Sequence, residues 1–252
     1  MRVLLSNDDG YQAAGLKALR EELVRLPEVD ELYVVAPDRE RSAVGHGITM
    51  HRPLRAKPLD FGAEKTRGWA VDGTPADCVK LAIEELLPDV PDLVVAGINQ
   101  GANLGTDVIY SGTVSAAVEG VINGVPAMAI SLTDFHSRDF SQAARFAARL
   151  VSQFAGINLP PGVLLNVNVP PGQPAGVQVA RLGWRRYINI FDRRTDPRGR
   201  EYFWMAGEPL EVDENTPDTD VCANRLGFIT ITPVKIDMTD YQFMQKIAHR
   251  QW

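Results

Sequence analysis

Apolar residues recur in two alternating patterns along the first two-thirds of the chain. Short runs rich in Val and Leu, typical of buried strands, alternate with longer segments in which apolar residues recur every three or four positions, typical of amphipathic helices. The pattern predicts strands at residues 2–6, 31–36, 92–97, 127–131 and 163–169, and helices at residues 15–25, 76–87, 114–123 and 140–154. Strands separated by helices in this way form a mostly parallel sheet that is covered on both faces. We therefore expect an α/β, doubly wound fold.

The pattern changes after Pro170, where Gly, Pro, aromatic and charged residues replace the periodic segments. Residues 187–191 and 201–205 flank a Thr-Asp-Pro-Arg-Gly turn sequence at residues 195–199. Apolar and aromatic runs on either side of such a turn predict a long β-hairpin.

One more strand is predicted at residues 227–232, followed by a terminal helix at about residues 239–249. A chain of 252 residues can form a single α/β domain with an elaboration. We therefore divide it into a catalytic core of residues 1–170 and an extension of residues 171–252. The extension holds the β-hairpin and the terminal helix, and we expect it to serve oligomerisation.

Composition and charge exclude several classes of protein. The chain is 45% hydrophobic and 23% charged, as globular proteins are, and its net charge is −6. A general attraction to nucleic acid polymers or to an anionic membrane surface is therefore not expected. The sequence has no basic segment followed by a long apolar stretch at its start, and no membrane-spanning run. Cys78 and Cys222 are far apart among apolar or small neighbours, which favours buried thiols and a cytoplasmic location.

The strongest chemical signal is the sequence Ser-Asn-Asp-Asp-Gly at residues 6–10, directly after the first predicted strand. The carboxyl ends of parallel strands border the ligand crevice of such folds, so Asp8 and Asp9 are placed where substrates bind. Two ionised carboxylates ~5 Å apart repel each other by roughly 3 kcal/mol at an effective dielectric constant near 20, and a divalent cation would reverse this cost. The alternative is a solvated turn that precedes the next helix.

Two further loops leave the same predicted edge of the sheet. The loop at residues 37–47 contains Ser42, Gly45 and His46, and the loop at residues 98–105 contains Asn99. Carboxylate, hydroxyl and amide oxygens are hard ligands that suit Mg²⁺ or Mn²⁺. The alternative for Ser42 and Asn99 is ordinary turn chemistry.

A third feature is the sequence Ser111-Gly112-Thr113 at the start of a predicted helix. Small residues leave the amide groups of the first turn accessible, and the helix dipole also favours an anion there. A phosphoryl group could bind at this point, although Ser or Thr could equally act only as a helix cap.

Motifs of other enzyme classes are absent from the sequence. The chain has no Walker A sequence, no Gly-x-Ser-x-Gly motif and no complete dinucleotide-binding glycine pattern. The triplet Asp72-Gly73-Thr74 is similar to the haloacid dehalogenase motif, but Ala70 occupies the position where that motif has a second acid. Since no Ser–His or Cys–His pair is evident, a metal-activated water is the more economical nucleophile.

The ordered set of motifs closely resembles the SurE family of survival proteins. The motifs that carry the resemblance lie at residues 6–10, 36–43, 73–79, 97–105 and 110–117, and the similarity extends through residues 202–204 and 229–233. The resemblance implies a Rossmann-like phosphatase that acts on nucleoside 5′- and 3′-monophosphates, in some members also on short polyphosphate. It further implies homodimers or tetramers formed through an extended hairpin and an exchanged C-terminal segment.

The same resemblance implies roles for individual residues. The ligands of one Mg²⁺ or Mn²⁺ per subunit would be Asp8, Asp9, Ser42 and Asn99, with Asp8, Asp9 and Asn99 in catalysis. Phosphate contacts would fall on Asn99, Ser111, Gly112 and Thr113.

We therefore interpret the chain as a metal-dependent phosphomonoesterase of nucleoside monophosphates. Gly45 and His46 are the candidate contacts to the nucleoside, and the proton for the leaving group could come from Asp8, His46 or solvent. The alternative is a non-catalytic module that binds nucleotides for regulation.

Overall fold

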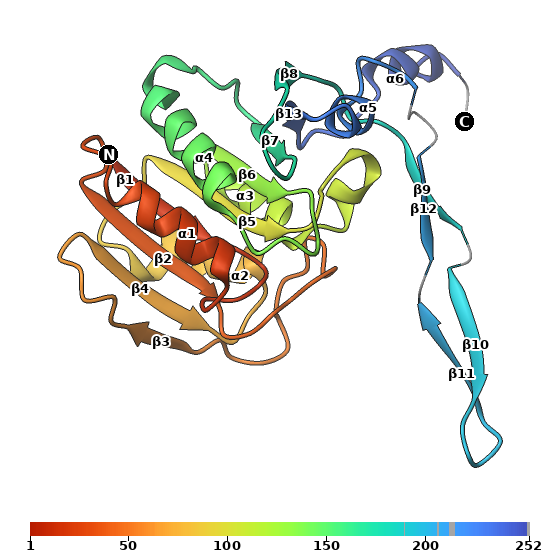
Figure 1. The fold of residues 1–252 in the computed structure, drawn as a ribbon, viewed down its shortest axis with the longest axis horizontal. Helices are drawn as coiled ribbons and strands as arrows, with labels where there is room; N and C mark the ends of the chain where they lie inside the picture. Colours follow the sequence, from red (N-terminus) through yellow and green to blue (C-terminus); the bar gives the residue numbers. More distant parts are fainter. Residues whose placement is uncertain (189, 206, 212–214, 251–252) are drawn as a thin grey trace.

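The computed structural model describes residues 1–188, 190–205, 207–211 and 215–250. Its centre is a sheet of nine strands in the order β3-β4-β2-β1-β5-β6-β7-β13-β8 (Figure 1). The strands are β1 (Arg2–Ser6), β2 (Glu31–Pro37), β3 (Ala56–Leu59), β4 (Thr66–Val71), β5 (Leu93–Gln100), β6 (Ala127–Leu132), β7 (Val163–Val169), β8 (Gly176–Val179) and β13 (Phe228–Lys235). The six neighbours from β4 to β7 are all parallel. β3 is antiparallel to β4, and β13 is antiparallel to β7. The expected α/β, mostly parallel fold is therefore confirmed.

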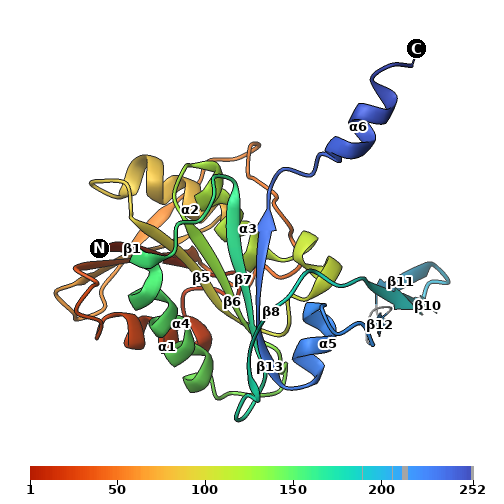
Figure 2. The ribbon, with the colours of Figure 1, turned by 90° about the horizontal axis from the view of Figure 1, so that it is seen from above.

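Helices cover both faces of the sheet (Figures 1 and 2). The helical elements are α1 (Ala14–Leu23), α2 (Pro75–Leu81), the π-helical turn η1 (Ala82–Leu86), the 3-10 turn η2 (Gly105–Ile109), α3 (Gly112–Ile122), α4 (Ser141–Gln153), the 3-10 turn η3 (Phe154–Gly156), α5 (Asp220–Arg225) and α6 (Tyr241–Ile247). Apolar residues of α1 and α4 share one buried cluster with the sheet, and those of α2 and α3 share another. Alternation along the strands separates the two clusters: Val3 and Leu5 face the first, whereas Leu4 faces the second.

The order of the strands reverses direction beside β1. From β1 the chain moves outward through β2 to β4, and it then returns to the other side of β1 with β5 and continues to β6 and β7. Ligands of open α/β sheets bind at the carboxyl ends of the strands where the order reverses. This point lies between Ser6 at the end of β1 and Gln100 at the end of β5.

The predicted elements differ from the observed ones in a few places. β3, β4, β8 and α5 were not predicted, and the helix expected at residues 76–87 consists of α2 and the π-helical turn η1. The strand expected to end at residue 97 continues to Gln100 as β5, so Asn99 lies in a strand and not in a loop. The register between β5 and β6 shifts between Ala96 and Asn99, which allows pairing to resume at Asn99.

The segment after residue 170 contributes both to the sheet and to a long arm. β8 and β13 complete one side of the sheet. β9 (Arg185–Ile188) pairs with β12 (Glu208–Glu211), and β10 (Phe191–Thr195) pairs with β11 (Glu201–Met205), so the predicted hairpin is longer than its two expected strands. Figure 1 shows this arm projecting from the body of the molecule. The sheet continues across residue 170, because β8 and β13 belong to it. The division into a core of residues 1–170 and an extension of residues 171–252 stays a prediction.

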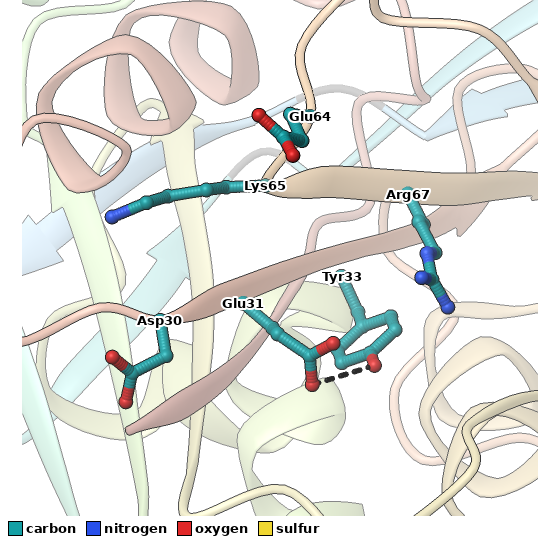
Figure 3. A pocket seen from close by; sticks show the side chains of 6 residues that line it. All are labelled: Asp30, Glu31, Tyr33, Glu64, Lys65 and Arg67. Atoms are coloured by element: carbon teal, nitrogen blue, oxygen red, sulfur yellow. Dashed lines mark hydrogen bonds between the residues drawn. The ribbon is translucent and has the colours of Figure 1, made fainter.

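A cavity of about 400 Å³ opens at the amino ends of β2 and β4. Figure 3 shows its lining, in which the Tyr33 hydroxyl donates to Glu31 at 3.0 Å. Three acidic and two basic side chains line it together with Tyr33, and it lies at the sheet edge opposite to the carboxyl ends of the strands. Across the described ranges, the structure has no helix with the length and apolarity that a membrane span requires.

The close approach of α3 to the sheet generates a test of the fold. A Cβ atom on Gly120 would lie 2.8 Å from Cγ2 of Val94 and 3.4 Å from Cβ of Ala127. Overpacking of a core costs about 1–3 kcal/mol, which we expect to outweigh the gain of up to ~1 kcal/mol in helix propensity. Gly120→Ala should therefore lower the melting temperature, whereas Gly156→Ala, where a Cβ would meet nothing within 4 Å, should leave it unchanged or raise it. A melting temperature for Gly120→Ala at or above that of the wild type would contradict this packing.

Candidate functional site

Asp8 and Asp9 follow β1 at the edge where the strand order reverses. Asp8 is 4% exposed, and its Oδ1 accepts a hydrogen bond from the Thr113 hydroxyl. Asp9 is half-buried, and its Oδ2 accepts from the backbone amide of Gln100 at 3.2 Å. The two carboxylates are therefore held from two sides, one by the start of α3 and the other by the end of β5.

Burial raises the pKa of both carboxyl groups. For Asp8, loss of solvent raises the pKa, and hydrogen bonds from Thr113 oppose this effect. For Asp9, loss of solvent and then the charge of Asp8 raise the pKa to about 6. Across the part of the chain that the structure describes, neither carboxylate forms an ion pair with Lys, Arg or His. The site thus concentrates negative charge that no neighbouring side chain neutralises.

The first turn of α3 lies against Asp8 because Gly112 has no side chain. A Cβ atom at residue 112 would lie 2.7 Å from the Asp8 Cβ and 2.9 Å from its Oδ2. The Ser111 side chain caps the helix by accepting from the Val114 amide at 3.0 Å, which confirms the capping interpretation. Capping does not exclude a phosphate contact, since the amides of Gly112 and Thr113 also belong to this turn.

Asn99 lies near the end of β5, beside the acid pair. Its side-chain nitrogen donates to the Gly101 carbonyl at 2.8 Å, which orients the amide group. The side-chain oxygen of Asn99 is therefore the atom that could bind a cation. It is a hard oxygen donor, as the carboxylates of Asp8 and Asp9 are.

The loop that connects β2 to β3 reaches the site through its backbone. The Arg41 amide donates to the Asp8 carbonyl at 2.7 Å. The exposed Ser42 hydroxyl donates to Glu40 at 2.6 Å and not to either aspartate. Glu40 itself contributes to the raised pKa of both aspartates, so it is a third acid at this edge that sequence reasoning did not single out. The sequence could have indicated this role of Glu40, because Glu40 lies after β2 in the same loop as Ser42.

The structure gives His46 a partner away from the acid pair. The His46 Nε2 lies 2.7 Å from Oε2 of Glu119, a carboxylate that is 4% exposed in the middle of α3. The hydrogen bond from His46 is the main cause that lowers the pKa of Glu119. Gly45 donates from its amide to the Tyr110 carbonyl at 3.0 Å. These contacts tie the loop to both ends of the segment from Tyr110 to Glu119.

The base of the hairpin arm contacts η2, the turn that precedes α3. Arg185 of β9 forms an ion pair of 2.7 Å with Asp107 in η2, and both side chains are largely buried. The Tyr187 hydroxyl donates to the same carboxylate at 2.9 Å. The Asp107 carbonyl in turn accepts from the amides of Tyr110 and Ser111. Asp107 therefore connects the arm to the start of α3.

The donor set suits a hard divalent cation. Two desolvated carboxylates, an oriented amide oxygen and a nearby hydroxyl match Mg²⁺ or Mn²⁺ better than Zn²⁺ or copper. The Asn7 side-chain oxygen, next to Asp8, is buried without a hydrogen-bond partner. Within the described ranges no group of three or more His, Cys, Asp and Glu residues could hold a metal ion. The donor set described above has two carboxylates together with amide and hydroxyl oxygens, so it is not a group of that kind.

The chain is similar to known proteins over almost its whole length. The sequence model of the family described as survival protein SurE matches residues 3–189. A 5′-nucleotidase SurE from Pelotomaculum thermopropionicum is 63% identical over 247 residues, which cover 98% of this chain and 94% of the relative. Another from Desulforudis audaxviator is 56% identical, with 100% of this chain and 97% of the relative covered.

A solved structure gives the same result for the fold. The SurE protein from Aquifex aeolicus superimposes with a TM-score of 0.84 at 38% sequence identity, and 98% of each chain is covered. The family model spans most of the chain, and the relatives match almost all of it at more than 50% identity. The chain therefore belongs to the SurE survival protein family.

Proposed function

We propose that this protein is a phosphomonoesterase that depends on a divalent metal ion and hydrolyses nucleoside 5′-monophosphates to nucleoside and phosphate. The observation that carries the proposal is the pair of desolvated carboxylates, with Asp8 held by the first turn of α3 and Asp9 by the end of β5. Among the described residues, no Lys, Arg or His forms an ion pair with either carboxylate. The name of the relatives, 5′-nucleotidase SurE, supports the same activity.

Asp8, Asp9, Ser42 and Asn99 are the proposed ligands of one Mg²⁺ or Mn²⁺. Such an ion, when bound, would polarise the phosphoryl group and lower the pKa of a water molecule that attacks phosphorus. Ser42 would give up its hydrogen bond to Glu40 for this role.

The protein's own groups orient the substrate and stabilise charge. Thr113 fixes the Asp8 carboxylate and Gln100 fixes that of Asp9, so neither has to be ordered when substrate binds. The first-turn amides at Gly112 and Thr113, with Ser111 and Asn99, would receive the equatorial oxygens of the phosphoryl group. The proton for the leaving alkoxide could come from Asp8, solvent or His46, whose Nε2 is shared with Glu119.

Small phosphate esters fit the site better than polymers do. The net charge of −6 opposes long polyanions, so the attraction for phosphate must be local. We include nucleoside 3′-monophosphates and short polyphosphate in the proposed range as secondary substrates. We also propose a cytoplasmic location, which the two free, buried cysteines Cys78 and Cys222 support.

The alternative is a regulatory module that binds nucleotides without hydrolysing them. It would need no activated water, so an assay of phosphate release from AMP with Mn²⁺ and with EDTA separates the two functions. Release that depends on the metal supports the enzyme. Tight AMP binding without release would support the module.

We propose that two copies of the chain associate through the hairpin arm, as a homodimer or a homotetramer. Six aromatic residues in and beside the arm are at least 40% exposed, more than two strands can bury against each other: Trp184, Tyr187, Phe191, Tyr202, Phe203 and Trp204. Exposed aromatic surface of this extent is typical of a protein interface.

Removal of one carboxylate should abolish most of the activity. We expect Asp8→Asn and Asp9→Asn each to lower kcat/KM for AMP by at least ~100-fold with the fold intact, because each removes half of the charge that would hold the cation. Phosphate release in Mn²⁺ and circular dichroism provide the measurements. Turnover near that of the wild type in either variant would exclude the ligand assignment.

Asp9→Asn should also stabilise the metal-free protein. An acid whose pKa rises to about 6 on folding contributes stability at low pH, and this contribution is lost as the pH increases from about 4 to above 6. In EDTA at pH 7.5 we expect the variant to melt about 2–4 °C above the wild type, with a difference that shrinks towards pH 4. Added Mn²⁺ should raise the melting temperature of the wild type only. A variant that melts below the wild type in EDTA at pH 7.5 would show that the charged Asp9 carboxylate does not destabilise the folded protein.

Deletion of the arm tip should disturb the oligomer. Removal of residues 190–201 deletes β10, the strand with which the aromatic strand β11 pairs. The ion pair between Arg185 and Asp107 stays in place. Light scattering should then report a smaller particle than for the full chain. An unchanged mass would place the interface elsewhere.

A further inference from the structure

An exposed aromatic residue, Phe135, stands at the same sheet edge as the acid pair. It follows β6, which ends at Leu132 and pairs with β5 through Asn99 and Gln100. Its side chain is 70% exposed. Exposure of a phenyl ring to water is unfavourable by itself. A ligand that covered the ring would remove this unfavourable exposure.

The loop that carries Phe135 is fixed to the site by Gln100. The Gln100 side-chain nitrogen donates to the Phe135 carbonyl at 2.6 Å and lies 3.4 Å from the Ser137 carbonyl. Its side-chain oxygen accepts from Arg138 at 3.2 Å, and its backbone amide donates to Asp9. One residue therefore contacts both the proposed metal site and the loop with the exposed ring, so the two are held in a fixed relation.

The ring borders the proposed phosphate contact. A Cβ atom on Gly101 would lie 3.3 Å from Cδ2 of Phe135 and 3.8 Å from Nδ2 of Asn99. Both groups thus adjoin the small space that Gly101 leaves without a side chain. His136 packs against Phe135 in a T-shaped arrangement with ring centroids 6.1 Å apart, which further restricts the orientation of the phenyl ring.

We infer that Phe135 is the platform on which the base of the nucleotide stacks. This inference rests on the proposed function and identifies what distinguishes a nucleotide from a simple phosphate ester. Aromatic rings beside phosphate sites bind bases through their flat faces, and such contacts tolerate any base. The loop is already ordered by Gln100, so the ring needs no rearrangement to receive the base.

Two other groups could contact the nucleoside. His46 is bonded through Nε2 to Glu119, so its polar edge is already used. Tyr110, which is 63% exposed, immediately precedes the proposed phosphate loop. Tyr110 therefore provides a matched comparison, as an exposed aromatic residue next to the site on another loop.

The experiment compares AMP with glycerol phosphate at fixed Mn²⁺. In the wild type we expect kcat/KM for AMP to exceed that for glycerol phosphate by at least ~10-fold. Phe135→Ala should lower this ratio about tenfold, mainly through a higher KM for AMP, and leave glycerol phosphate unchanged. Phe135→Trp should keep the ratio, and Tyr110→Ala should keep it within about threefold.

An unchanged ratio in Phe135→Ala, or a loss of the ratio in Tyr110→Ala alone, would overturn the inference. Equal rates for the two substrates in the wild type would also overturn it, while leaving the phosphatase intact. If the wild type releases no phosphate at all, the proposed function fails instead. Calorimetric binding of AMP with Mn²⁺ to the wild type and Phe135→Ala then decides whether the ring binds the base, with weaker binding to the variant expected.

Discussion

The desolvation of two adjacent carboxylates is the constraint on which the rest of this site depends. Asp8 is buried and Asp9 half-buried at one sheet edge, and within the described ranges neither forms an ion pair with a cationic side chain. In isolation this arrangement is unfavourable, and the protein offsets it only in part with hydrogen bonds from Thr113 and Gln100. A bound cation could recover the unfavourable free energy that remains. The instability of the metal-free site and the affinity of the proposed metal site would therefore have the same origin.

The close packing of α3 makes this arrangement possible. Between α3 and the sheet the side chains are small, with Ala96, Ala117 and Ala129 in the buried cluster and Gly120 directly over Val94. Because the helix lies so near the sheet, its first turn reaches Asp8, and Gly112 removes the last obstacle. Core packing and the position of the proposed anion site are therefore set by the same residues, and a change that lifts the helix would move both.

Much of this could be read from the sequence, for identifiable reasons. Alternation of apolar runs with helical periodicity predicted the central strands because each is buried on both faces. Asp8 and Asp9 stood out because two adjacent acids follow a buried strand at the edge where such folds bind ligands. β4 was missed because Arg67 and Gly68 interrupt its apolar pattern, although it lies beside β2 in the sheet.

Other parts could not be predicted from local sequence. The place of Asn99 within β5 depends on a register shift against β6, which is a tertiary event. The partner of His46 is 73 residues away in α3, and nothing near His46 in the chain indicates it. Phe135 reads as an ordinary surface residue until Gln100 is seen to hold its loop beside Asp9.

The ion pair between Arg185 and Asp107 divides the arm into two parts that are free to change to different degrees during evolution. Among the described residues, the strands of the tip, from Phe191 to Met205, pair with each other and with no other strand, so we expect insertions and deletions there to leave the body of the molecule unchanged. The base is different, because Asp107 also supports the backbone of Tyr110 and Ser111. If copies of the chain associate through the tip as proposed, divergence in subunit assembly can proceed there, while the base must evolve together with the proposed phosphate contacts.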